Sequence, residues 1–126
     1  DRVGLTIGFV PELSKKIYAG ADMFLMPSQS EPCGLAQMIA LRYGTIPIVR
    51  ETGGLRDSIH DAGDKNGNGF TFKSYNAHDM LDAVVRARAY YDDKMKWGRL
   101  VNTALKQNFS WTKSAKDYIA LYNDIH

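Results

Sequence analysis

The chain has 126 residues, of which 44% are hydrophobic and 24% are charged, and its formal net charge is +2. These proportions are typical of a globular domain or of part of one. Acids match the basic residues almost one for one and leave no basic stripe, so neither a nucleic-acid partner nor a membrane partner is expected. Cys33 is the single cysteine, which excludes an internal disulfide and favours a reducing, cytoplasmic location.

The chain is expected to begin with a strand, a short helix and a second strand. Residues 4–10 form an apolar run with flanking glycines, which predicts a strand, and Pro11 then opens a turn. Apolar residues at helical spacing follow, and Gly20 is expected to end that helix. Residues 23–26 are apolar on both faces, which is typical of a strand inside a parallel sheet.

The same alternation continues in the next segment. A loop over residues 27–32 leads into a predicted helix from Gly34 to Tyr43, which Gly44 ends, and residues 46–49 read as a buried strand. Short connections of this kind imply right-handed crossovers. The pattern therefore predicts an α/β fold, a partial Rossmann-like parallel sheet of three to four strands with helices on both faces.

The remainder of the chain is predicted to be mainly helical. Residues 61–69 are expected to form a surface loop, residues 70–72 a short strand, and the segment after them three helices. Residues 1–75 would then be the second half of a Rossmann-like domain, and residues 76–126 would pack on it as C-terminal helices. Because so few strands make only half of such a sheet, we expect the chain to start inside a domain and to self-associate through its uncovered surface.

The segment from Pro27 to Leu35 contains the first candidate for chemistry. A buried strand ends there, and the helix expected at Gly34 would present free amides and the positive end of its dipole to a phosphate or a sugar oxygen. Glu31 stands directly in front of this helix start. An equally open interpretation is that Glu31 only caps the helix, an interaction worth about 0.3 to 1 kcal/mol.

A second candidate, Thr52-Gly53-Gly54, follows the next strand. Adjacent glycines let the backbone approach a ligand closely, although a tight turn alone would also explain them. Two such loops on consecutive parallel strands face the same rim, which favours a ligand site. Phe9, at the end of the first predicted strand, would offer this rim a flat face, although a core aromatic is the commoner case.

The sequence offers no sign of a metal site or of a common nucleotide-binding loop. The three histidines lie far apart in the sequence without a ligand spacing, and neither a Walker loop nor a GxGxxG motif is present. Neither a metal nor another cofactor is therefore predicted.

Residues 21–59 resemble the donor-site region of bacterial glycogen synthases and plant starch synthases. The motifs SEPCGL, RYGTIP and TGGLRD occur in the order and with the spacing of that family, and the resemblance extends over nearly the whole chain. These proteins are retaining glucosyltransferases of the GT-B type, which have two Rossmann-like domains. The resemblance implies that this chain corresponds to the C-terminal half of the second domain, and that the domain to which residues 1–75 belong binds a nucleotide sugar.

The resemblance also implies an activity and a set of site residues. The parent protein would transfer glucose from ADP-glucose to the non-reducing end of an α-1,4-glucan such as glycogen, with retention and without a cofactor. Glu31 would be the donor-site glutamate that contacts the sugar hydroxyls and supports the transition state. The other donor-site residues would supply amides to glucose and the diphosphate, stack near adenine or close the cleft: Cys33, Gly34, Leu35, Phe9, Thr52, Gly53 and Gly54.

Two positions depart from the wider superfamily. Ile39 replaces a second glutamate that binds ribose in other branches, as is usual in the synthases, and Ala36 lacks a polar group that many relatives carry. The resemblance places a glycine loop with a lysine and a histidine of the site in the N-terminal domain of the same protein, and the Arg/Lys pair that grips the diphosphate upstream of Asp1. This chain alone is therefore expected to be inactive. Two alternatives stay open: a retaining GT-B enzyme for another nucleotide sugar, and a non-catalytic glucan-binding module.

Overall fold

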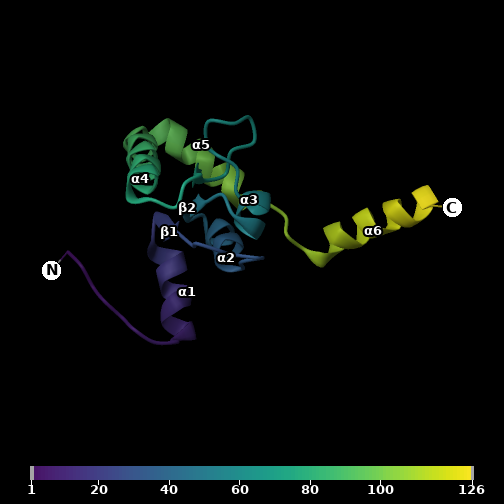
Figure 1. Ribbon diagram of the computed structural model, residues 1–126, viewed down its shortest axis with the longest axis horizontal. Helices are drawn as coiled ribbons and strands as arrows, with labels where there is room; N and C mark the ends of the chain where they lie inside the picture. Colours follow the sequence, from purple (N-terminus) through teal and green to yellow (C-terminus); the bar gives the residue numbers. More distant parts are fainter. Residues whose placement is uncertain (1, 126) are drawn as a thin grey trace.

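Three parallel strands form the centre of the structure, a computed structural model that describes residues 2–125 (Figure 1). The strands β1 (Met23–Met26), β2 (Ile46–Arg50) and β3 (Phe70–Phe72) lie side by side in chain order. Met23 pairs with Ile46, and Ile48 pairs with Phe70. The predicted α/β class and parallel sheet are confirmed, with three strands.

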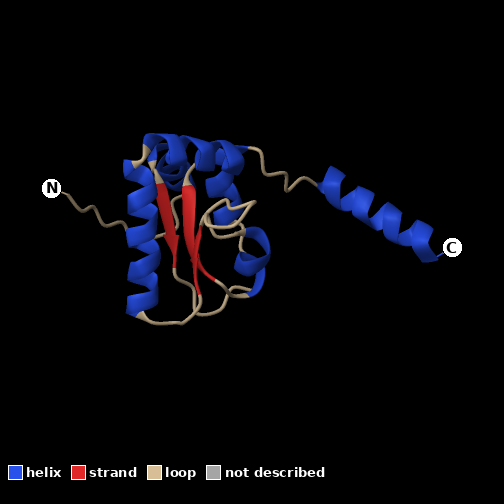
Figure 2. Cartoon of the chain, turned by 90° about the horizontal axis from the view of Figure 1, so that it is seen from above, coloured by secondary structure: helices blue, strands red, loops and turns tan. Residues whose placement is uncertain are grey.

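Helices cover the sheet on both faces. Figure 2 shows the strands lying between helices, and α2, α3, α4 and α5 all contact β2. The helices are α1 (Pro11–Gly20), α2 (Ala36–Tyr43), α3 (Gly53–Ser58), α4 (Ala77–Asp92), α5 (Lys94–Leu105) and α6 (Trp111–Ile125). None of these helices is long and apolar enough to cross a membrane.

The hydrophobic core is built around the central strand β2. Residues 46–49 are fully buried because strands flank β2 on both edges and helices cover both of its faces, which explains their unbroken apolar sequence. Phe70 packs edge-on against Tyr90 of α4, with 5.2 Å between ring centroids. Gly44 ends α2 in a left-handed conformation (φ 79°), as predicted.

The predicted strand over residues 4–10 is wrong. This segment is irregular, and Val3, Leu5, Ile7 and Phe9 are 84–95% exposed. The segment does have the apolar pattern of a strand, but a strand also needs a neighbouring backbone to satisfy its hydrogen bonds. The segment has no such neighbour within residues 2–125.

Two further elements differ from expectation. β1 is expected inside the sheet, but within residues 2–125 it lies at the edge of the three-stranded sheet, and Leu25 is 44% exposed. The helices α4 and α5 pack on the body of the structure, whereas α6 has no buried residue and reaches away from it (Figures 1 and 2). The division after residue 75 and the self-association of the exposed apolar surfaces stay predictions.

An ion-pair network ties the loop over residues 61–69 to α4. Arg86 donates to both carboxylate oxygens of Asp61 (2.8 and 3.0 Å) and to the carbonyl oxygen of Thr71 (2.7 Å). The Thr71 amide also donates to Asp61. Burial alone would raise the pKa of Asp61, but these hydrogen bonds and the Arg86 charge outweigh it and lower that pKa below its ordinary value.

Asp61→Asn is expected to lower the free energy of unfolding by about 1–2 kcal/mol at neutral pH, because it removes a charge-assisted pair that is only partly exposed. A carboxylate with a lowered pKa stabilises the fold above its unfolded pKa and stops doing so as the pH falls through the folded pKa. Urea unfolding at neutral and acidic pH should therefore show the difference shrinking in acid. Asp82→Asn, at a more exposed partner of Arg86, is the control and should cost less. Equal losses for both variants would contradict the prediction.

Candidate functional site

Two segments at the carboxyl ends of β1 and β2 pack directly against each other. The loop between β1 and α2 covers residues 27–35, and we call it the Glu31 loop. The segment after β2 covers residues 51–54, and we call it the Gly54 segment. The Gly54 amide donates to the carbonyl oxygens of Glu31 and Pro32, both at 3.1 Å. The two candidate loops of the sequence therefore meet at one rim of the sheet.

Glycine is required in the Gly54 segment because of this close approach. Gly53 has φ 44°, and a Cβ atom built on it would overlap the carbonyl oxygen of Glu31. A Cβ atom on Gly54 would overlap the carbonyl oxygen of Cys33. The segment is not the open loop that the sequence predicts. Gly53 and Gly54 begin the short helix α3, and Thr52 precedes the helix with an extended backbone.

The start of α2 lies two residues later than predicted. The helix begins at Ala36, because Gly34 has a left-handed backbone (φ 74°) that cannot continue a helix. The amide N–H groups of Cys33, Gly34 and Leu35 are used by no hydrogen bond within residues 2–125. Successive free amides in a turn form a concave site for anions, so this row of three can receive oxygen atoms of a ligand.

The Glu31 carboxylate is half-buried and is available for a ligand. Its one hydrogen bond in the described chain comes from the Ser28 hydroxyl, 3.4 Å from Oε2, and no ion pair there involves it. Within residues 2–125 the Glu31 carboxylate accepts no hydrogen bond from an amide of α2, so it is not a hydrogen-bonding cap of that helix. The alternative that its charge only favours the helix dipole stays open. A carboxylate beside a row of amides can accept hydrogen bonds from hydroxyls while the amides bind an anion.

Gln37, which the sequence analysis did not single out, joins the parts of the site. Its side chain is fully buried, and Nε2 lies within hydrogen-bond distance of the carbonyl oxygens of Cys33 (3.2 Å) and Gly34 (2.9 Å) and of the Ser58 hydroxyl (3.1 Å). Ser58 in turn donates to the carbonyl oxygen of Gly54 (2.6 Å). A buried amide must find partners, so a glutamine among the apolar residues of α2 was the signal for this role.

The structure does not bring Phe9 to this site. Its side chain is 95% exposed on the irregular N-terminal segment, and the strand that would have placed it at the rim is not formed. The other predicted residues, from Glu31 to Leu35 and from Thr52 to Gly54, do lie together.

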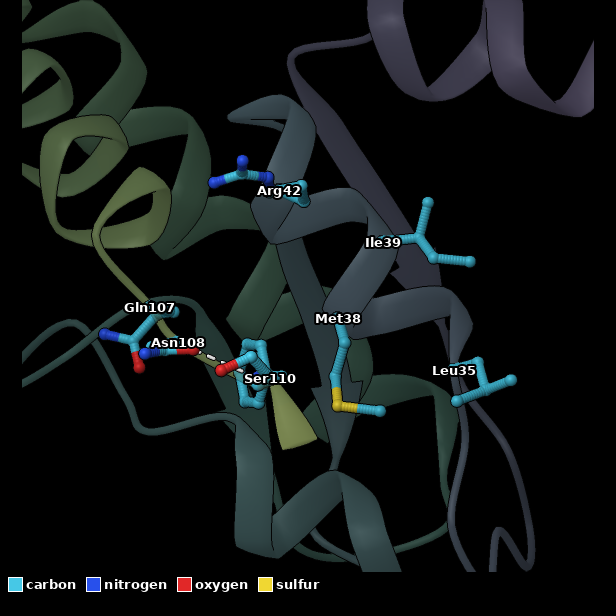
Figure 3. A pocket seen from close by; sticks show the side chains of 8 residues that line it. Leu35, Met38, Ile39, Arg42, Gln107, Asn108 and Ser110 are labelled. Carbon is cyan, nitrogen blue, oxygen red and sulfur yellow. Dashed lines mark hydrogen bonds between the residues drawn. The ribbon is translucent and has the colours of Figure 1, made fainter. Parts of the chain in front are cut away.

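A hollow of about 510 Å³ adjoins the start of α2. It lies between α2 and the connection from α5 to α6 (Figure 3). The surface that lines it is mostly apolar, and Arg42 lies at one end. The lining residues are Leu35, Met38, Ile39 and Arg42 on the α2 side and Gln107, Asn108, Phe109 and Ser110 on the opposite side. Because Leu35 belongs to both features, a ligand bound at the free amides could extend along this side of α2.

Comparison with known proteins identifies relatives of the whole chain. The glycogen synthases of Anoxybacillus flavithermus and Bacillus anthracis are each 54% identical over 127 residues, which cover 99% of this chain but 26% and 27% of theirs. The chain thus spans about a quarter of the length of these relatives. The resemblance found in the motifs is confirmed.

A solved structure and a family profile agree with these relatives. The catalytic domain of Starch Synthase IV from Arabidopsis thaliana, bound to ADP and acarbose, superposes with a TM-score of 0.83 at 45% identity, over 94% of this chain and 25% of that one. This match confirms the fold class as part of a GT-B glycosyltransferase. The profile described as "Glycosyl transferases group 1" matches residues 5–99. The chain therefore belongs to the group 1 glycosyltransferase family.

Proposed function

We propose that this chain is the donor-binding part of an enzyme that transfers glucose from ADP-glucose to the non-reducing end of an α-1,4-glucan, with retention. One observation carries the proposal: the Glu31 carboxylate, free of ion pairs in the described chain, lies in the same short loop as the free amides of Cys33, Gly34 and Leu35. Relatives named glycogen synthase, and a related starch synthase that binds ADP, support this assignment.

The proposed chemistry divides the developing charges between the two parts of the site. As the bond between the sugar and the diphosphate breaks, positive charge grows on the glucosyl ring and negative charge on the departing phosphate. Fixed dipoles and charges stabilise such a transition state without having to reorganise. Glu31 would hold the sugar hydroxyls and favour the positive ring, and the amides of Cys33, Gly34 and Leu35 would hold the phosphate and sugar oxygens.

The remaining roles are also proposals. Thr52, Gly53 and Gly54 would close around the donor, and Phe9 would stack near the adenine where the parent protein supplies a neighbouring strand that holds its segment at the rim. The N-terminal domain of the same protein would supply the rest of the cleft and most of the glucan contacts, so the isolated chain would bind the donor weakly and not turn it over. The cytoplasmic location expected from the sequence stays a prediction.

Titration of the chain with ADP, UDP and ADP-glucose, followed by NMR, tests the proposal. The amide signals of Cys33, Gly34, Leu35 and Gly53 are expected to shift at millimolar ligand, and to shift more with ADP than with UDP. Gly98, on the exposed side of α5, is the internal control and should not move. A folded chain whose Glu31-loop amides stay unchanged at millimolar ADP would contradict the proposal.

A further inference from the structure

We propose that Arg50 is a positioning residue that holds the Glu31 loop in place for the reaction. Arg50 is the last residue of β2, and its guanidinium donates three hydrogen bonds to three different carbonyl groups. Nε donates to Ser28 (3.0 Å), Nη2 to Gln29, and Nη1 to Lys73 (3.2 Å). Its expected effect on activity rests on the proposed function.

These contacts join the carboxyl ends of all three strands. Ser28 and Gln29 follow β1, Arg50 ends β2, and Lys73 directly follows β3. The Arg50 side chain thus links the three strand ends by hydrogen bonds at this rim, as backbone hydrogen bonds link the strands inside the sheet. A loop held to two strands by one planar group has little freedom to rotate about either.

The Glu31 loop needs such an anchor because its own backbone provides few. Pro27 and Pro32 have no amide N–H to donate. The Gly54 amide holds the loop at the carbonyl groups of Glu31 and Pro32. Arg50 holds it at Ser28 and Gln29, on the N-terminal side of Glu31. The carboxylate therefore sits between two anchor points, and loss of either would let it move.

The geometry of the guanidinium matters more here than its charge. Arg50 forms no ion pair within residues 2–125, and its cationic carbon lies 5.7 Å from the centre of the Tyr75 ring. Its donors point in three directions, which the planar fork of arginine provides and the single ammonium of lysine does not. Arg50→Lys therefore separates the two explanations, since it keeps the charge but loses the fork.

The experiment uses the full-length protein with Arg50→Ala and Arg50→Lys. The control is Arg99→Lys, at an exposed position of α5. Both Arg50 variants are expected to lower kcat about tenfold with a smaller change in KM for ADP-glucose, because the misplaced group acts in the transition state. Arg99→Lys should match the wild type. Wild-type kcat in Arg50→Lys would overturn the proposal, because it would show that charge alone suffices.

A double-mutant cycle with Glu31→Gln tests whether Arg50 acts through Glu31. If it does, Arg50→Ala should add little to the loss already caused by Glu31→Gln, whereas a residue that only stabilises the fold would cost the same in both backgrounds. Multiplying losses would overturn the proposal. If Glu31→Gln leaves activity unchanged, the proposed role of the Glu31 charge fails separately. Hydrogen exchange of residues 28–31 then decides for Arg50: unchanged exchange in Arg50→Lys overturns the anchoring.

Discussion

Gly54→Ala is expected to lower kcat/KM of the full-length protein for ADP-glucose more than 100-fold, since a misplacement of about 1 Å in an active site already costs about 100-fold. The new methyl group would overlap the carbonyl oxygen of Cys33 and lie 2.6 Å from its carbonyl carbon and 2.7 Å from its Cα atom. All three are backbone atoms, so no side chain can turn aside to make room. The Glu31 loop must move away, and the hydrogen bonds from Gly54 to Glu31 and Pro32 stretch or break.

Gly98→Ala is the matched control for this substitution. Gly98 lies within α5, and a Cβ atom there would meet nothing within 4 Å. Alanine at such a position should stabilise the helix by about 0.5–1 kcal/mol and leave catalysis unchanged. Steady-state kinetics and thermal unfolding of both variants make the comparison. Normal activity in Gly54→Ala would mean that the two segments do not touch in the working enzyme.

The fold could be predicted from the sequence where local pattern and tertiary context agree. Residues 46–49 are apolar without interruption, and residues 70–72 carry two phenylalanines on either side of Thr71. The structure buries both segments, because neighbouring strands and helices pack on them. Residues 4–10 carry an equally regular pattern but remain irregular, because no neighbouring strand lies beside them. The spacing of apolar residues indicates which face of a segment would be buried, but it does not show whether a neighbouring strand is present to pair with that segment.

The site could be predicted only in its local features. The motif resemblance and the adjacent glycines brought Glu31, Gly53 and Gly54 together correctly, since all follow neighbouring strands of one parallel sheet. Arg50 and Gln37 were missed because their partners lie up to 23 residues away in sequence. A polar residue in an apolar run indicates that a partner exists, but only the fold shows which one.

Glu31→Gln is expected to lower kcat of the full-length protein about 100- to 1000-fold, with little change in KM for ADP-glucose. Glutamine has nearly the same size and keeps one oxygen that accepts hydrogen bonds from the sugar hydroxyls. It loses the negative charge that would favour the positively charged ring, which is an interaction made mainly in the transition state. Loss of such an interaction lowers kcat and kcat/KM together.

Glu31→Ala and Glu12→Gln complete this test. Glu12 is an exposed residue of α1 that pairs with Lys15, so its substitution should leave kinetics unchanged and exclude a general effect of lost charge. Glu31→Ala removes both the charge and the hydrogen bonds, so KM should rise as well. If Glu31→Gln were fully active but Glu31→Ala were not, Glu31 would only position the sugar. If both variants kept full turnover, Glu31 would have no part in the reaction.

If the wild-type parent bound glucan but transferred no glucose, the non-catalytic glucan-binding module would become the better interpretation.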